Sequence, residues 1–188
     1  MKKLLLHLCC APCSASVIKY LKEEFDFLCE SGSDKQKLSA SFYWYNPNIW
    51  DFDEYNKRKE SAVRYAKELK LDFYEEKDFS YNYDDWKKQS GEICANCYKL
   101  RLEKAAKFAK ENGFDCFSTS LLSSPYQKHD IIKQVSQQLS GIYEIEFLYR
   151  NFTKFFYDGK NELRKQGYYL QKYCACNKSY NERFANKL

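Results

Sequence analysis

Seven of the nine cysteines in this 188-residue chain fall into three short clusters, a spacing typical of metal-binding or redox proteins. The clusters are Cys9, Cys10 and Cys13; Cys94 and Cys97; and Cys174 and Cys176. Soft thiolate ligands select zinc, copper(I) or iron–sulfur clusters. The Cys94–Cys97 pair beside adjacent Cys9 and Cys10 is a poor geometry for a four-thiolate zinc site. It fits a [4Fe–4S] cluster better, with three thiols left over.

The expected cellular compartment and the positions of Cys29 and Cys116 bear on whether the clustered thiols bind a metal. Residues 1–8 form a strand-length run that leads into charged sequence, and no apolar stretch approaches the length of a membrane span, so we expect a cytoplasmic protein without a membrane segment. That compartment keeps thiols reduced, which disfavours structural disulfides. A lone C-x-x-C is often only a buried apolar pair, but seven clustered thiols weaken that alternative. Cys29 and Cys116 lie within apolar segments and are predicted to be core residues.

The first two clusters each stand where a helix is predicted to begin. An apolar run at residues 3–8 precedes the first cluster, and residues 15–25 repeat apolar positions at helical spacing. The free N–H groups at a helix start favour thiolate over thiol. Pro12 suits this place because it lacks only an N–H that is unpaired anyway, and Ser14 is a possible helix cap.

Strand and helix patterns alternate along the rest of the chain. Strands are predicted at residues 38–45, 71–74, 114–119 and 143–148, and helices at residues 53–69, 80–88 (a short helix or lid), 94–109, 129–139 and 158–165. This order predicts one α/β domain spanning residues 1–188, with a Rossmann-like parallel sheet, right-handed crossovers and flanking helices. Polar residues 30–37 are predicted to be a surface insertion. Ligands bind such sheets at the carboxyl ends of strands, which is where the cysteines fall.

Polar side chains follow the same predicted strands. The candidates for substrate binding at these ends are Asn46, Asn48, Thr119, Ser120 and Ser124. The alternative, that they only form turns, is equally good. Tyr45 and Tyr126 are candidate proton donors. His7 is a weaker one, because a histidine inside an apolar strand is more often a core residue.

The C-terminal segment, residues 150–188, is basic and aromatic. It holds nine Lys/Arg against three Asp/Glu, a net +6 compared with +5 for the whole chain. Cations can follow phosphates while interleaved Phe and Tyr side chains stack on bases, so the segment favours an RNA partner. A solvated basic face over an aromatic core is the alternative.

Five motifs, in this order over nearly the whole chain, resemble the QueH-type epoxyqueuosine reductases. They are His7-Leu8-Cys9-Cys10-Ala11-Pro12-Cys13-Ser14, Tyr45-Asn46-Pro47-Asn48-Ile49, Cys94-x-x-Cys97-Tyr98-x-x-Arg101-Leu102, Thr119-Ser120-Leu121-x-x-Ser124-Pro125-Tyr126 and Gln171-x-Tyr173-Cys174-x-Cys176-x-x-Ser179. Two positions depart from the family pattern: Ala175 replaces a glycine and Ile93 replaces an arginine. Neither change removes a thiol.

The resemblance implies a HUP-like form of the fold and the last step of queuosine synthesis, the reduction of epoxyqueuosine at wobble position 34 of tRNA without cobalamin. It implies a [4Fe–4S] cluster on Cys9, Cys10, Cys94 and Cys97, and an additional mononuclear iron. Cys13, Cys174 and Cys176 are then catalytic, either as ligands of that iron or with Cys174 and Cys176 as a redox-active pair. Arg101 and Gln171 are expected to bind substrate. The implied partners are tRNA and an unidentified electron donor.

Two other functions remain as alternatives. One is a different tRNA-modifying enzyme of the ATP-dependent PP-loop type, but the glycine-rich phosphate loop of such enzymes is replaced here by residues 9–14, which contain Pro12 and no glycine. The other is a zinc-binding RNA module in which the cysteines only brace the fold. Colour separates the latter, because zinc proteins are colourless and [4Fe–4S] proteins are brown.

Overall fold

A six-stranded parallel sheet forms the centre of the molecule. The computed structural model describes residues 1–27, 36–77 and 79–184. The strand order is β2-β3-β1-β5-β6, and β4 pairs with the end of β3 opposite to β2. The strands are β1 (Lys2–His7), β2 (Asp26–Phe27), β3 (Lys37–Trp44), β4 (Phe73–Glu75), β5 (Cys116–Thr119) and β6 (Glu146–Phe147). The predicted α/β fold with a parallel sheet is confirmed.

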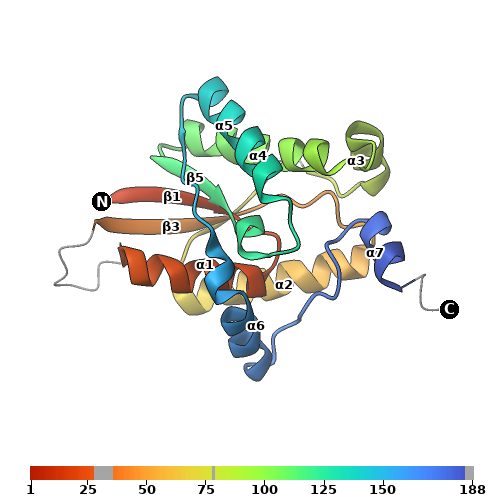
Figure 1. Ribbon diagram of the computed structural model, residues 1–188, viewed down its shortest axis with the longest axis horizontal. Helices are drawn as coiled ribbons and strands as arrows, with labels where there is room; N and C mark the ends of the chain where they lie inside the picture. The colour runs from red at the N-terminus through yellow and green to blue at the C-terminus, as the bar shows by residue number, and fades with distance from the viewer. Residues whose placement is uncertain (28–35, 78, 185–188) are drawn as a thin grey trace.

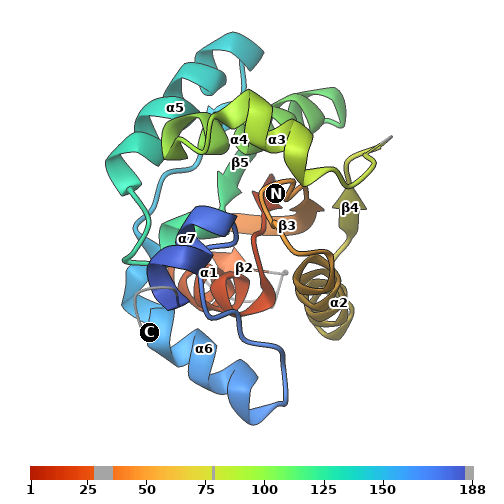
Figure 2. The same cartoon turned by 90° about the vertical axis from the view of Figure 1, so that its right-hand side faces the viewer.

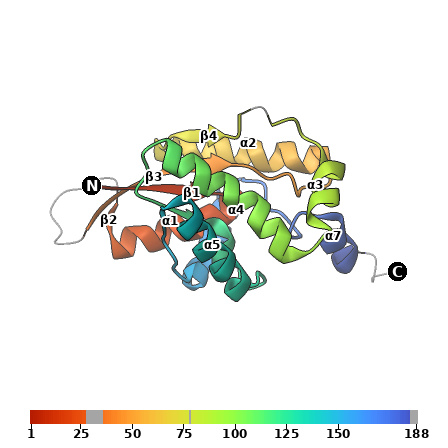
Figure 3. The same ribbon diagram turned by 90° about the horizontal axis from the view of Figure 1, so that it is seen from above.

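Helices cover both faces of this sheet. They are α1 (Ala11–Glu24), α2 (Phe52–Leu69), α3 (Tyr83–Ser90), α4 (Cys94–Glu111), α5 (His129–Tyr143), α6 (Phe156–Lys165) and α7 (Asn177–Phe184), with 3-10 turns η1 (Ser120–Ser123) and η2 (Phe152–Phe155). Figures 1 and 2 show α3, α4 and α5 on one side and α1, α2 and α6 on the other. Figure 3 shows α4 and α5 together over the sheet, where they pack against each other. Within the described residues, none of the helices is both long and apolar enough to cross a membrane.

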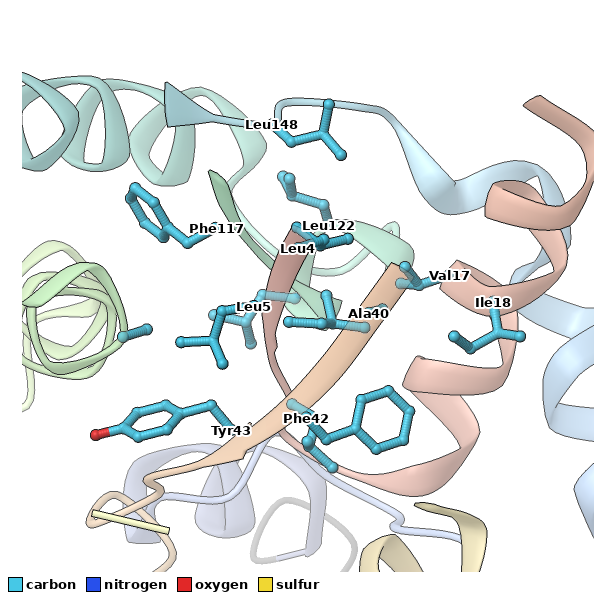
Figure 4. Close-up of a cluster of buried hydrophobic side chains, with 14 of the residues drawn as sticks. Leu4, Leu5, Val17, Ile18, Ala40, Phe42, Tyr43, Phe117, Leu122 and Leu148 are labelled. Atoms are coloured by element: carbon cyan, nitrogen blue, oxygen red, sulfur yellow. The ribbon is translucent and has the colours of Figure 1, made fainter. Parts of the chain in front are cut away.

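The core explains why the first strand is almost uninterruptedly apolar. Leu4, Leu5 and Leu6 are fully buried, because β1 is central and helices cover both of its faces. In Figure 4, Phe42 points toward the α1 side of the sheet and Tyr43 toward the opposite side. There the Tyr43 ring lies 4.9 Å from the ring of Phe108 on α4. Successive side chains of a strand point to opposite faces of the sheet, so Phe42 and Tyr43 contribute to the two hydrophobic layers on either side of it.

The strand register brings three loops to one edge. His7 at the end of β1 pairs with Tyr43 of β3 and with Thr119 of β5. The residues that follow these strands therefore meet at one end of the sheet, which is the right-hand end in Figure 1, near α3 and α7. This is the edge at which the sequence predicted the site.

Two local predictions need correction. Helix α1 (Ala11–Glu24) begins at the first cluster with Pro12 in its first turn, as predicted, but its cap is Cys10, whose side chain accepts a hydrogen bond from the Cys13 N–H. Ser14 is therefore not a cap: its hydroxyl donates to the Cys10 carbonyl over 2.9 Å inside the first turn. The strand predicted at residues 143–148 shrinks to β6, because α5 continues through Tyr143, whose hydroxyl bonds to Glu103 on α4.

The remaining sequence predictions have different outcomes in the structure. Helix α7 was not predicted. Cys116 is fully buried and His7 is a fully buried part of β1, so the core interpretation of both is confirmed. Cys29 and most of the segment 30–37 lie outside the described residues.

Candidate functional site

The three thiols of the first cluster converge at the start of α1. Their Sγ atoms all lie within 4.8 Å of one another, and those of Cys9 and Cys10 are 3.7 Å apart. In the described part of the chain, no other set of three or more Cys, His, Asp or Glu side chains is grouped in this way. This cysteine triad can hold a metal ion. All eight cysteines that the structure describes are free thiols.

The surroundings of the three thiols shift their pKa values in different directions. Hydrogen bonds from the Cys10 and Cys13 thiols, aided by the charge of Arg101, lower the pKa of Cys9 well below its usual value. Burial raises the pKa of Cys10, so that thiol stays protonated and donates. Ser120 fixes Cys9 from the neighbouring strand end: its Oγ accepts from the Cys9 N–H over 3.0 Å and donates to Cys9 Sγ over 3.4 Å.

Arg101 is a buried cation among the thiols. It is 1% exposed, and no carboxylate pairs with it among the residues described. Its charge acts on the thiols of Cys9, Cys97 and Cys174. Burial nevertheless raises the pKa of Cys97 to about 12. Because a buried charge needs compensation, Cys9, the thiol with the lowered pKa, is the natural counter-charge of this guanidinium.

Asn46 ties Arg101 to the first loop. Its Oδ1 accepts a 2.6 Å hydrogen bond from the guanidinium, and its Nδ2 donates to the Leu8 carbonyl over 2.9 Å. Asn46 is 1% exposed, so both polar ends of its side chain are used inside the protein. The amide thereby fixes the loop that carries Cys9 and Cys10 relative to α4, which begins with Cys94.

The C-terminal segment brings the third cluster to the first. Gln171 Nε2 lies 2.7 Å from Cys10 Sγ and 3.3 Å from Cys13 Sγ. Gln127, from the loop after β5, donates to Cys174 Sγ over 3.4 Å. Gln171 thus joins the C-terminal segment to the first cluster, and Cys174, about 160 residues away in sequence, lines the same pocket as Cys9 and Cys13.

A buried ion pair on α2 anchors this segment. Glu54 and Arg58 pair at 2.6 Å, with side chains 9% and 1% exposed. Arg58 also donates to the backbone carbonyls of Cys174, over 2.9 Å, and Tyr173, over 3.1 Å. The Tyr169 hydroxyl bonds to the other carboxylate oxygen of Glu54. Sequence reasoning missed this pair, because Glu and Arg four residues apart also occur on solvated helix faces.

A pocket of about 460 Å³ opens between the first loop and the C-terminal segment. Of the seven clustered cysteines, Cys9, Cys13 and Cys174 line it. Three other predicted site residues line it too: Ser124, Tyr126 and Gln171. The Oε1 atom of Gln171 is buried without a hydrogen-bond partner. The pocket lining thus combines thiols, hydroxyls and an amide.

Other predicted residues lie behind or beside this pocket. Asn48 is buried, and Thr119 Oγ1 lies 3.0 Å from His7 Nδ1 while it caps η1. Burial lowers the pKa of His7 to about 3. Tyr45 lines a separate pocket of about 310 Å³. Its ring packs edge-on against Phe79 at 5.1 Å.

Comparison with known proteins identifies the family of this chain. The family profile described as epoxyqueuosine reductase QueH matches residues 4–182. A protein named epoxyqueuosine reductase QueH from Dehalococcoides mccartyi is 32% identical over 97% of this chain and 94% of its own length. Proteins of the same name from Acinetobacter baylyi (33% identity, 93% and 78%) and Thermotoga maritima (29% identity, 94% and 89%) are similarly related. The chain therefore belongs to the epoxyqueuosine reductase QueH family.

Proposed function

We propose that this chain reduces epoxyqueuosine to queuosine at wobble position 34 of tRNA, the last step of queuosine synthesis, with a [4Fe–4S] cluster and a second thiolate site and without cobalamin. In the net reaction, both C–O bonds of the epoxide break and a C=C bond forms. Two electrons from an external reductant and two protons are consumed, and the oxygen leaves as water. The family membership supports the reaction, and the pocket lined by thiols supports its place in the molecule.

A buried cation near the thiols supports an anionic iron–sulfur group at this site. We assign the cluster to Cys9, Cys10, Cys94 and Cys97, and buried Arg101, which has no carboxylate partner among the described residues, is a suitable counter-charge. A cluster with four thiolate ligands supplies electrons one at a time when bound. Hydrogen bonds from Ser120 and the neighbouring thiols keep the Cys9 sulfur in position and favour its thiolate form, which supports the binding of such a group.

The three remaining thiols form the second site in this proposal. Cys13 and Cys174 both line the pocket, and Cys176 follows two residues later. We propose that the three hold an additional mononuclear iron that polarises the epoxide oxygen as a Lewis acid when bound. A redox-active Cys174–Cys176 pair is the alternative, and a metal analysis of a Cys174 variant separates the two.

The chain's own polar groups orient the substrate. Gln171 offers its unpartnered Oε1, and Ser124 lines the same pocket, so we assign both to hydrogen bonds with the hydroxyls of the modified nucleoside. Asn46, Asn48, Arg101, Thr119 and Ser120 are assigned to holding the loops instead, because all five are buried and none lines the pocket. Tyr45 faces the other pocket, and we assign it no step.

The observation that carries the proposal is the presence of Cys9, Cys13 and Cys174, from two ends of the chain, in one pocket of a QueH-family protein. The test is conversion of epoxyqueuosine-containing tRNA by anaerobically purified protein with a chemical reductant, followed by nucleoside mass spectrometry. Wild type should remove one oxygen from the modified nucleoside. Cys13→Ser should abolish conversion, and Cys116→Ala, a control outside the pocket, should retain it. Failure of wild type with full iron content contradicts the proposal.

A further inference from the structure

Five of the nine basic residues of the C-terminal segment form two groups with different surroundings. Arg150 pairs with Glu24 at 3.1 Å and Lys154 pairs with Glu23 at 2.7 Å, so both cations are compensated by α1. Three other cations line the cysteine pocket: Lys160, Lys172 and Arg183. In the described chain, none of these three makes an ion pair, so their charge is available to an outside anion.

Two exposed tyrosines stand at the same pocket. Tyr126 is 77% exposed and Tyr157 is 62% exposed, although large aromatic side chains are usually covered. Both line the pocket, and both pack edge-on against Phe156, at ring distances of 6.1 and 5.1 Å. The two rings come from different elements, the loop after η1 and helix α6, and Phe156 contacts both of them. Their exposed surface is available for stacking.

Cations and exposed aromatic rings around one opening match single-stranded RNA. The cations can follow a phosphate backbone, and unpaired bases stack on aromatic faces. A duplex offers its phosphates but not its base faces, so the tyrosines favour a loop over a stem. Glu182 also lines the pocket, which leaves an excess of two positive charges among these lining side chains.

We propose that Lys160, Lys172 and Arg183 bind backbone phosphates, and Tyr126 and Tyr157 stack on unpaired bases, of the RNA loop whose modified nucleotide enters the cysteine pocket. This inference rests on the proposed function, and it adds which side chains hold the RNA loop at the pocket. Tyr126, expected from the sequence to be a proton donor, acts here at the mouth of the pocket.

The test measures binding of a tRNA anticodon stem-loop to the full-length protein by fluorescence anisotropy over a range of salt concentrations. The triple variant K160Q/K172Q/R183Q should flatten the dependence of log K on log salt by about 2, since each phosphate contact on a single strand contributes about 0.7. Tyr126→Ala and Tyr157→Ala should each weaken binding about 5- to 100-fold without changing the slope. A duplex lacking the loop should compete poorly.

The double variant R150Q/K154Q and the single variants Arg150→Gln and Lys154→Gln are controls, because they remove positive charge from the same segment where α1 already neutralises it. Each should leave the salt slope unchanged, with thermal unfolding measured for every variant. If wild type binds the loop but the triple variant keeps its affinity and slope, the inference is wrong and the proposed function is unaffected. If wild type does not bind the loop at all, the proposed function itself fails.

Discussion

Arg101 donates a 2.6 Å hydrogen bond to Asn46 Oδ1, and this bond joins α4 to the loop after β3. Asn46 in turn holds the Leu8 carbonyl, immediately before the first cysteine cluster. The bond therefore couples the position of Cys9 and Cys10 to the helix that carries Cys94 and Cys97. It also holds the positive charge of Arg101 near Cys9, whose pKa that charge helps to lower.

Arg101→Gln should lower the reduction potential of the bound cluster, on the order of tens of mV, because the loss of a nearby positive charge disfavours the more negative reduced state. Iron content per chain should also fall. Arg101→Lys keeps the charge and should shift the potential less. Anaerobic redox titration followed by visible absorption measures both variants, and equal potentials in wild type and Arg101→Gln would contradict the electrostatic role.

Arg58→Met should destabilise the protein by about 3–5 kcal/mol, because it leaves the Glu54 carboxylate buried without its partner. Amide hydrogen exchange of residues 170–176 should rise, since Arg58 holds two backbone carbonyls there. Arg64→Met on the same helix is the matched control: the Arg64–Glu68 pair has the same spacing but side chains 48% and 45% exposed, and its loss should cost at most about 1 kcal/mol. Equal effects of both substitutions contradict the anchor.

The sequence predicted the edge of the sheet at which the thiols meet but not the residues that hold them there. The apolar run at residues 3–8 and the helical spacing that follows carry local information, so the first cluster could be placed at a strand-to-helix turn. The pairs Glu54–Arg58 and Arg64–Glu68 look alike in sequence. Only the tertiary packing makes one of them buried, and this could not be read from the spacing.

Two elements show the same limit. Tyr143, Ile145 and Phe147 have the composition of a strand, yet α5 continues through Tyr143 because it packs along α4. Helix α7 is short and polar, and its aromatic contacts come from distant residues: Tyr180 lies 5.2 Å from Trp50 and 5.3 Å from Tyr173 by ring centroids. Such contacts have no local signature.

Gly159→Ala should destabilise the protein by about 1–3 kcal/mol, because a Cβ there would stand 2.6 Å from the Ser16 backbone nitrogen, where α6 crosses α1. Gly141→Ala is the control in α5. Its Cβ meets nothing within 4 Å, so the change should stabilise by about 0.4–1 kcal/mol through the unfolded chain. Urea unfolding measures both. A Gly159→Ala protein as stable as wild type contradicts the close approach that places α6 beside the pocket.

Cys116 should resist alkylation at pH values where ordinary thiols react. Burial raises the pKa of its thiol to about 12, so at pH 8.5 the reactive thiolate is nearly absent. Its side chain is also fully covered in β5, whereas Cys174 is exposed. Iodoacetamide labelling of metal-free protein with peptide mass spectrometry should modify Cys174 well before Cys116. Equal labelling in folded protein contradicts this placement.

The most direct test of the two-site reductase is iron, sulfide and zinc analysis of anaerobically purified protein, with a visible spectrum, for wild type, Cys94→Ala and Cys174→Ala. The account predicts a brown wild-type protein with four sulfides and more than four irons per chain. Cys94→Ala should lose the cluster, and Cys174→Ala should lose only the additional iron. Retention of all iron in Cys174→Ala would instead identify Cys174 and Cys176 as a dithiol pair. A colourless wild-type protein that holds only zinc would contradict the redox mechanism.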